Sequence, residues 1–170
     1  MRSVRVESET PGDAVRVVGV LGGEPLESVS VTSGALAALG FDGEPNKTQL
    51  VATSDGPVLL VGLGEEIDRD GLGLAAGAAG RAIPASKTAA TSLHQIDVDG
   101  ALEAVVVGFL SGAYRYDAYR SSDGPDLGDL VLLGHVDAGA TTGPRLVAEA
   151  VGRARDWVNR PPVDKSPDVG

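Results

Sequence analysis

The chain has 170 residues, enough for one domain and too short for two of ordinary size. Apolar residues make up 42% of it and charged residues 22%, which is typical of a globular protein. No apolar run approaches the ~20 residues that span a bilayer, so we expect no membrane span. Cysteine is absent, which excludes disulfides and thiolate chemistry. The 14 Lys and Arg against 24 Asp and Glu give a net charge of −10, which argues against binding to nucleic acid or to anionic lipid.

The first part of the chain is rich in strand signals. Alternating or β-branched apolar runs predict strands at 3–7, 14–21, 47–53 and 58–63. The dipeptide Asp55-Gly56 predicts that the last two form a hairpin. Residues 58–63 (VLLVGL) are apolar at consecutive positions, so we expect that strand to be central and covered on both faces. Residues 36–39 predict a short helix that Gly40 closes.

The middle of the chain predicts a helix and a further strand. Leu and Ala residues from position 72 onward indicate a helix that Asp68 or Asp70 caps and that ends near Ile83, before Pro84. Its many Ala and Gly residues would let a neighbouring element pack closely. A strand is expected at 89–96.

Residues 101–119 carry conflicting signals. The three valines at 105–107 favour a strand, whereas apolar residues repeat at helical spacing over four turns, far beyond the usual length of a strand. We therefore predict a helix. We expect the side chains of Phe109 and Leu110 to be buried and those of Arg115 and Arg120 to be exposed.

The last part of the chain predicts a short buried strand at 130–133 and a long helix. Thr142 is the expected cap of this helix and Pro144 lies in its first turn. The apolar stripe of the helix consists of Leu146, Val147, Ala150, Val151, Ala154, Trp157 and Val158. We expect this stripe to pack on the sheet, with the first three turns buried.

Interleaved strands and helices predict the α/β class, as a three-layer sandwich with a mostly parallel or mixed sheet. Pro161-Pro162 ends the last helix, and the final ten residues include three prolines. We expect one domain over 1–159 and a linker over 160–170, mobile unless a neighbouring molecule holds it.

Two glycine patterns resemble parts of nucleotide sites. Residues 71–76 (GLGLAA) fit G-x-G-x-x-G/A, but the acidic stretch 65–70 separates them from the preceding strand, where the motif belongs. A small-residue face for helix packing is the more ordinary interpretation. Gly62-Leu63-Gly64 does stand at a strand end, where α/β folds place ligands, although two glycines are weak evidence.

Each of the two histidines has acidic neighbours: His94 has Asp97 and Asp99, and His135 has Asp137. Each group offers one imidazole without a second His at helical spacing, so solvated loop residues are the expected interpretation. The motifs G-x-S-x-G, H-E-x-x-H and G-x-x-x-x-G-K-[ST] do not occur. We therefore predict no catalytic, cofactor-binding or metal-binding residue in this chain.

All three tyrosines fall within residues 114–119 (YRYDAY). A base-stacking surface would need a net positive charge, and here Arg115 and Arg120 are balanced by Asp117 and an acidic chain. We expect instead that the rings close a helix against the sheet, with hydroxyls bonded to polar partners.

Two longer segments carry a family resemblance. Residues 108–121 (GFLSGAYRYDAYRS) end a helix in small residues and continue with Tyr, a basic residue, an aromatic residue and Asp. Residues 146–167 (LVAEAVGRARDWVNRPPVDKSP) contain Ala-Arg-Asp, an apolar pair, Asn and a proline-rich exit. With VLLVGLG at 58–64 and the Ala/Gly-rich helix that follows it, they resemble the N-terminal domain of the leucyl aminopeptidase (cytosol aminopeptidase) family.

The resemblance implies an α/β domain related to the macro domain, joined by a long helix to a catalytic domain with two divalent metal ions (Mn or Zn), a catalytic Lys and an assisting Arg. Motifs similar to that domain's G-K-G-x-T-F-D-[ST]-G-G and N-T-D-A-E-G-R do not occur in the sequence. Lys165 lies in the exit segment, and no Asp-Ser-Gly-Gly follows it. The chain alone is therefore expected to be inactive.

These features lead to three hypotheses about function. By the resemblance, the chain is a non-catalytic domain that serves subunit assembly, in a homo-oligomer expected to be a hexamer, and places its own catalytic domain, which would remove N-terminal residues from peptides. The alternative is a free-standing macro-like module that binds ADP-ribose or a nucleotide, with Gly62 and Gly64 as its only candidates. DNA binding, found in some members, is disfavoured by the charge. A charged N-terminal segment and the absence of cysteine favour the cytoplasm.

Overall fold

The computed structural model describes residues 3–31, 33–116 and 128–161. Its strands are β1 (Val4–Glu7), β2 (Val15–Leu21), β3 (Glu24–Pro25), β4 (Thr48–Thr53), β5 (Gly56–Gly64), β6 (Ala89–Thr91) and β7 (Leu130–Leu133). Its α-helices are α1 (Ser33–Ala38), α2 (Arg69–Ala82), α3 (Ala101–Gly112) and α4 (Thr142–Asn159), with short 3₁₀ turns η1 (Leu93–Gln95) and η2 (Ala138–Thr141). Within the described residues, no helix combines the length and apolar character needed to cross a membrane.

The strands form one mixed sheet in the order β1-β7-β6-β2-β5-β4, with β3 beside β2. Neighbours from β1 to β5 run parallel, whereas β4 and β5 form the predicted antiparallel hairpin, in which Thr53 pairs with Gly56. Residues 58–63 of β5 are buried throughout, as their unbroken apolar run predicted.

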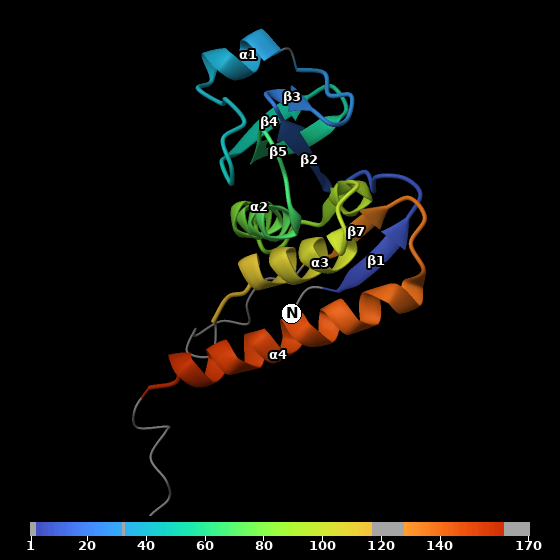
Figure 1. Cartoon of the computed structure of the whole chain (residues 1–170), viewed down its shortest axis with the longest axis vertical. Helices are drawn as coiled ribbons and strands as arrows, with labels where there is room; N and C mark the ends of the chain where they lie inside the picture. Colours follow the sequence, from blue (N-terminus) through green and yellow to red (C-terminus); the bar gives the residue numbers. More distant parts are fainter. Residues whose placement is uncertain (1–2, 32, 117–127, 162–170) are drawn as a thin grey trace, which may run out of the picture.

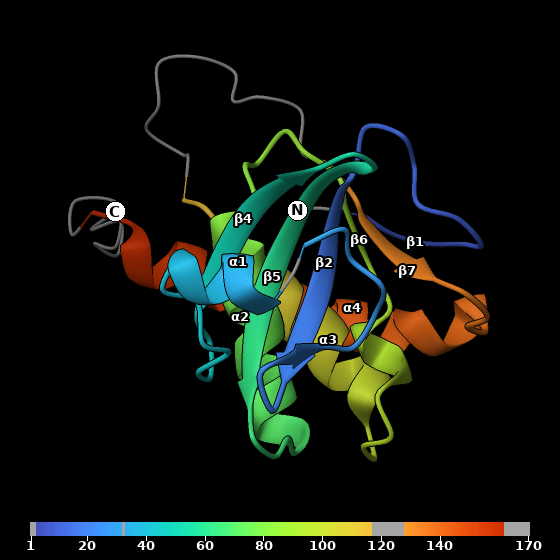
Figure 2. The same ribbon diagram turned by 90° about the horizontal axis from the view of Figure 1, so that it is seen from above.

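Helices α2, α3 and α4 lie on one face of the sheet and the short α1 lies on the other (Figures 1 and 2). The predicted three-layer α/β arrangement with a mixed sheet is confirmed. Successive residues of β2 and β5 alternate between the two layers, because strand side chains point to opposite faces. Thus Val17 and Val61 pack toward α2 and α3, while Val18 and Leu60 pack beneath α1.

The structure shortens two predicted elements. The strand expected at 89–96 ends at Thr91, whose hydroxyl donates to the Val17 carbonyl at 3.1 Å and accepts the Leu93 N–H at 3.2 Å. This local side-chain bond turns the backbone into η1. The helix expected to run to about residue 119 ends at Gly112, so the predicted helix over 113–116 is wrong. Positions 117–119, and Arg120, lie outside the described residues.

Further details of the prediction stand, except for the cap of α4. Phe109 and Leu110 are 1% and 2% exposed, and Arg115 is exposed. Asp68, one of the two candidates, caps α2 by accepting the Gly71 N–H at 2.7 Å. The cap of α4 is Thr141 instead of Thr142, which is the first residue of the helix.

Glycines set the distance between α2 and α3. A Cβ added at Gly108 would lie 2.2 Å from the carbonyl oxygen of Gly73, and one at Gly112 would lie 2.0 Å from that of Gly77. Both distances are far shorter than a van der Waals contact, so these helices touch backbone to backbone. The small-residue interpretation of the GLGLAA segment is therefore confirmed. An ion pair of 2.7 Å between Arg69 and Glu103 links the exposed ends of the two helices.

Candidate functional site

The sheet end at which Gly62 and Gly64 stand is occupied by the chain's own loop, residues 42–47. Gly62 donates its N–H to the Lys47 carbonyl at 2.8 Å and accepts the Asn46 N–H at 2.9 Å. A Cβ at Gly62 would lie 2.0 Å from the Glu44 carbonyl oxygen. These glycines therefore admit a loop of the same chain, which removes the observation on which the nucleotide interpretation depended.

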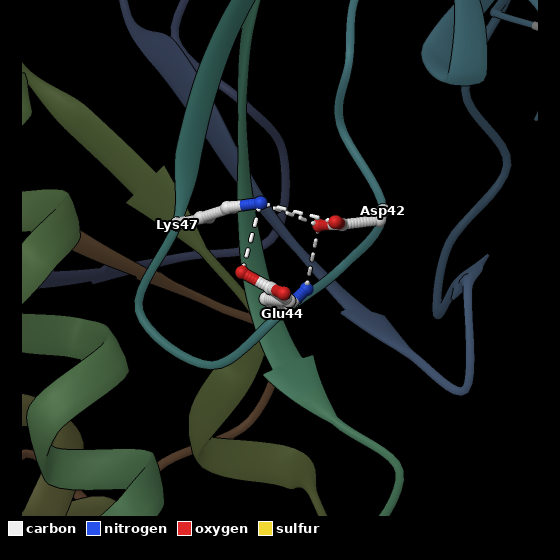
Figure 3. A network of polar contacts seen from close by, with 3 residues as sticks. All are labelled: Asp42, Glu44 and Lys47. Carbon is white, nitrogen blue, oxygen red and sulfur yellow. Dashed lines mark hydrogen bonds and ion pairs between the residues drawn. The ribbon is translucent and has the colours of Figure 1, made fainter.

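A network of three charged side chains closes this loop (Figure 3). The Lys47 Nζ lies 3.0 Å from Asp42 Oδ2 and 2.8 Å from Glu44 Oε2, and the Glu44 N–H donates to Asp42 Oδ1 at 3.2 Å. Hydrogen bonds with Glu44, and then with Asp42, raise the pKa of the Lys47 ammonium group, while the bond from Lys47 lowers the pKa of Asp42. Lys47 thus stays protonated and is unsuited to act as a base or nucleophile.

The two histidine groups are not assembled into metal sites. Asp97 and Asp99 are exposed, His135 is exposed, and Asp137 accepts the Gly139 N–H at 2.9 Å as the cap of η2. Among residues 3–31, 33–116 and 128–161, no three His, Asp or Glu side chains are grouped so that they could hold a metal ion. These residues do not fit the two divalent ions that the family resemblance implies.

His94 gives a testable pH dependence. Its ring is half-buried, and neither ring nitrogen has a hydrogen-bond partner among the described residues. Burial lowers the pKa of His94 below its ordinary value of 6.5. The unfolded chain therefore takes up this proton at a higher pH than the folded chain, and the free energy of unfolding decreases as the pH falls below about 6.5.

We expect His94→Gln to flatten this decrease between about pH 7 and pH 5, as measured by urea denaturation across that range. His135→Gln is the matched control, because His135 is exposed and is the only other histidine. Equal flattening in both variants would contradict the assignment to His94.

The tyrosine segment packs against α4. The Tyr114 hydroxyl donates to Asp156 Oδ1 at 2.7 Å, and Arg155 lies over the ring, 5.5 Å from its centroid. Burial, and then the bond to Asp156, raises the pKa of the Tyr114 hydroxyl. The expected polar partner is thus present, but the ring closes against a helix instead of the sheet. Asp117 and Tyr119 lie outside the described residues.

Helix α4 is oriented opposite to the prediction. Of its residues only Ala148 is fully buried, and the half-buried Gly152 and Asp156 continue the same row toward α3. Gly152 lies beside Tyr114, whose Cδ2 would be in ordinary van der Waals contact, at 3.9 Å, with an added Cβ. The row is therefore formed by small and polar residues, and the expected burial of the apolar stripe is wrong.

Apart from the half-buried Val151, the apolar stripe of α4 instead faces away from the domain. Leu146 is 60% exposed, Val147 45%, Trp157 72% and Val158 75%. At about 100° per residue, these side chains and those of the exposed Ala150 and Ala154 fall within an arc of roughly 120°. We call these six residues the outer face of α4. Figure 1 shows the helix along the margin of the molecule, beyond α3.

Comparison with known proteins identifies the chain. The N-terminal domain model of the cytosol aminopeptidase family matches residues 27–123, more than half of the sequence. The chain belongs to this family. The match includes the first segment on which the resemblance was based, 108–121, and the resemblance is confirmed.

Curated relatives of this aminopeptidase-family domain are much longer. The probable cytosol aminopeptidase of Mycobacterium tuberculosis (strain ATCC 25177 / H37Ra) is 34% identical over 167 residues, covering 92% of this chain and 32% of the relative. That of Nocardia farcinica is 35% identical over 142 residues, covering 76% of this chain and 27% of the relative. The chain spans about a third of the length of these relatives.

Solved structures agree on the fold. The bottromycin maturation enzyme BotP matches with a TM-score of 0.74 and 30% identity, over 92% of this chain and 35% of the enzyme. A second structure of BotP, in complex with Mn, has a TM-score of 0.72 and 29% identity, over 92% of this chain and 34% of that one. A mutant of tomato leucine aminopeptidase, at 17% identity, matches with a TM-score of 0.68 over 95% of this chain and 39% of that chain, which supports the fold alone.

Sequence reasoning found the apolar stripe of α4 but missed that it lies on the exposed side of the helix. The row Ala148, Gly152 and Asp156, spaced four residues apart, was the available signal. Small residues at this spacing allow a helix to pack closely through its less apolar side. The position of the loop 42–47 beside Gly62 left no comparable signal, because its hydrogen bonds with Gly62 are made by main-chain atoms.

Proposed function

We propose that this chain is the non-catalytic N-terminal domain of a two-metal leucyl aminopeptidase that removes N-terminal amino acids from peptides. Its role is subunit assembly and placement of the catalytic domain. The observation that carries the proposal is the match of residues 27–123 to the N-terminal domain of the family, in a chain that spans about a third of its curated relatives.

The arrangement of possible metal ligands and the packing of the described residues support a role other than catalysis. Hydrolysis at two metal ions needs several clustered carboxylate or histidine ligands, and the described residues group no three of them. The carboxyl end of β5, a place where α/β folds commonly hold ligands, is covered at Gly62 and Gly64 by the loop at 42–47. What the chain does present is an apolar helix face.

For the whole protein we propose a homo-oligomer, a hexamer, in the cytoplasm, with two Mn or Zn ions in the catalytic domain. The domain proper extends over 1–159, and 160–170 is the linker. BotP, whose matched structure contains Mn, is consistent with a metal requirement elsewhere in such proteins.

The 170-residue chain is expected neither to hydrolyse leucine p-nitroanilide nor to bind Mn²⁺ or Zn²⁺ stoichiometrically. Isothermal titration calorimetry with each metal measures binding. An absorbance assay measures hydrolysis, with the full-length Mycobacterium tuberculosis relative as positive control. A metal site of micromolar affinity, or turnover by the chain, would contradict the proposal.

A further inference from the structure

We propose that the outer face of α4 is the surface against which the remaining two-thirds of the polypeptide packs in full-length members of this family. The inference rests on the proposed function and adds to it the residues of the contact. The most exposed large side chains of the outer face are those of Leu146, Trp157 and Val158, which are 60%, 72% and 75% exposed.

The orientation of α4 is the first reason. An amphipathic helix of an isolated domain normally turns its apolar side inward. Here the inward row contains Ala148, Gly152 and Asp156. The burial of Ala148 and the hydrogen bond between Asp156 and Tyr114 fix the helix in this orientation. A contiguous apolar face that is left outside by such fixed packing is typical of an interaction site.

The position of the outer face favours the rest of the same polypeptide as its partner. The exposed fraction is largest at Trp157 and Val158, in the last turn of α4, next to the point where longer relatives continue into the part that this chain does not match. A segment joined directly to that turn reaches the face at high effective concentration, unlike a free protein.

The charged residues beside the outer face indicate which partner surface would be complementary to it. Arg153 and Arg160 are both exposed beside the outer face, and the Arg160 guanidinium lies 6.0 Å from the centre of the Trp157 ring. In a chain with a net charge of −10 these cations are a local exception. The complementary surface is therefore apolar at its centre with carboxylates at its rim.

Thiol labelling tests the proposal, because the chain has no cysteine. Single variants Leu146→Cys and Val158→Cys are made in the 170-residue chain and in a full-length chimera, in which this chain replaces the matching part of the Mycobacterium tuberculosis relative. Labelled peptides are quantified by mass spectrometry. We expect labelling of both sites to be at least about tenfold slower in the chimera than in the chain alone.

Leu74→Cys is the matched control, because Leu74 is an exposed leucine, at 61%, on helix α2. It should label equally fast in both proteins. Equal rates at Leu146→Cys and Val158→Cys in chimera and chain would overturn the proposal. Aminopeptidase activity of the chimera is measured in parallel: activity without protection overturns only this inference, and protection without activity overturns only the proposed function.

A second measurement does not depend on the chimera. The 170-residue chain is compared with its Leu146→Ser/Val158→Ser variant in two experiments. These are sedimentation velocity at rising concentration and flotation with vesicles of anionic phospholipid. We expect a monomer that does not float. A dimer, or vesicle binding, that the double substitution abolishes would assign the outer face to a second copy or to a lipid surface and overturn the proposal.

Discussion

Replacing Phe109 by alanine is expected to lower the free energy of unfolding by about 3 to 5 kcal/mol. The ring is 1% exposed and belongs to the core between the sheet and helices α2 and α3. Its removal loses the transfer free energy of the ring and leaves a cavity that rigid, glycine-spaced helices cannot close. Urea denaturation followed by circular dichroism measures the change.

The control for this substitution is Leu74→Ala. Leu74 is a large apolar residue on the neighbouring helix α2, but it is 61% exposed. Its truncation should change the free energy of unfolding by no more than about 0.5 kcal/mol. A loss below about 1 kcal/mol for Phe109→Ala would show that the ring is not in a packed core.

Gly112→Ala is expected to destabilise the domain by about 3 kcal/mol, at the upper end of the usual cost of overpacking. The added Cβ would lie 2.0 Å from the Gly77 carbonyl oxygen, a backbone atom that cannot move without displacing α2. The same added methyl group normally favours a helix by roughly 1 kcal/mol, so the sign of the effect separates packing from helix propensity.

Gly143→Ala provides the matched comparison. Gly143 also lies in a helix, α4, and a Cβ there would meet no atom within 4 Å. This substitution should be neutral or stabilising, by up to about 1 kcal/mol, in the same denaturation experiment. If both glycine substitutions had the same effect, the close contact between α2 and α3 would be contradicted.

Most of the fold follows from local patterns in the sequence. The β-branched run of β2, the Asp55-Gly56 turn and the unbroken apolar run of β5 each predicted an element correctly. The errors arise where one side chain outweighs a pattern. Thr91 ends β6 by bonding the backbone beyond it, and α3 stops at Gly112, before Tyr114 turns to α4.

The orientation of α4 could not be predicted from periodicity alone. A hydrophobic stripe shows that a helix has an apolar side, but not whether that side faces its own domain or another one. Leu146 and Trp157 would satisfy either arrangement. The deciding contact is the hydrogen bond between Asp156 and Tyr114, which joins residues 42 positions apart in the sequence.

The candidate site was predictable in part. The GLGLAA and histidine patterns are weak in their sequence context. The structure gives GLGLAA a role in helix packing and leaves His135 exposed, as expected. The expectation that His94 is a solvated loop residue is wrong, because its ring is half-buried in η1. The loop over Gly62 could not be foreseen, because main-chain hydrogen bonds to Asn46 and Lys47 carry no signature in side chains.

The emission spectrum of Trp157 tests the orientation of α4 most directly. It is the only tryptophan of the chain, and it is 72% exposed at the end of the outer face. If the stripe were docked on the sheet, as the sequence suggested, native emission would be blue-shifted and would move red on unfolding. With the outer face exposed, the native 170-residue chain should emit as a water-exposed tryptophan, with little shift in urea. A blue-shifted native spectrum from the monomeric chain would contradict the exposed outer face.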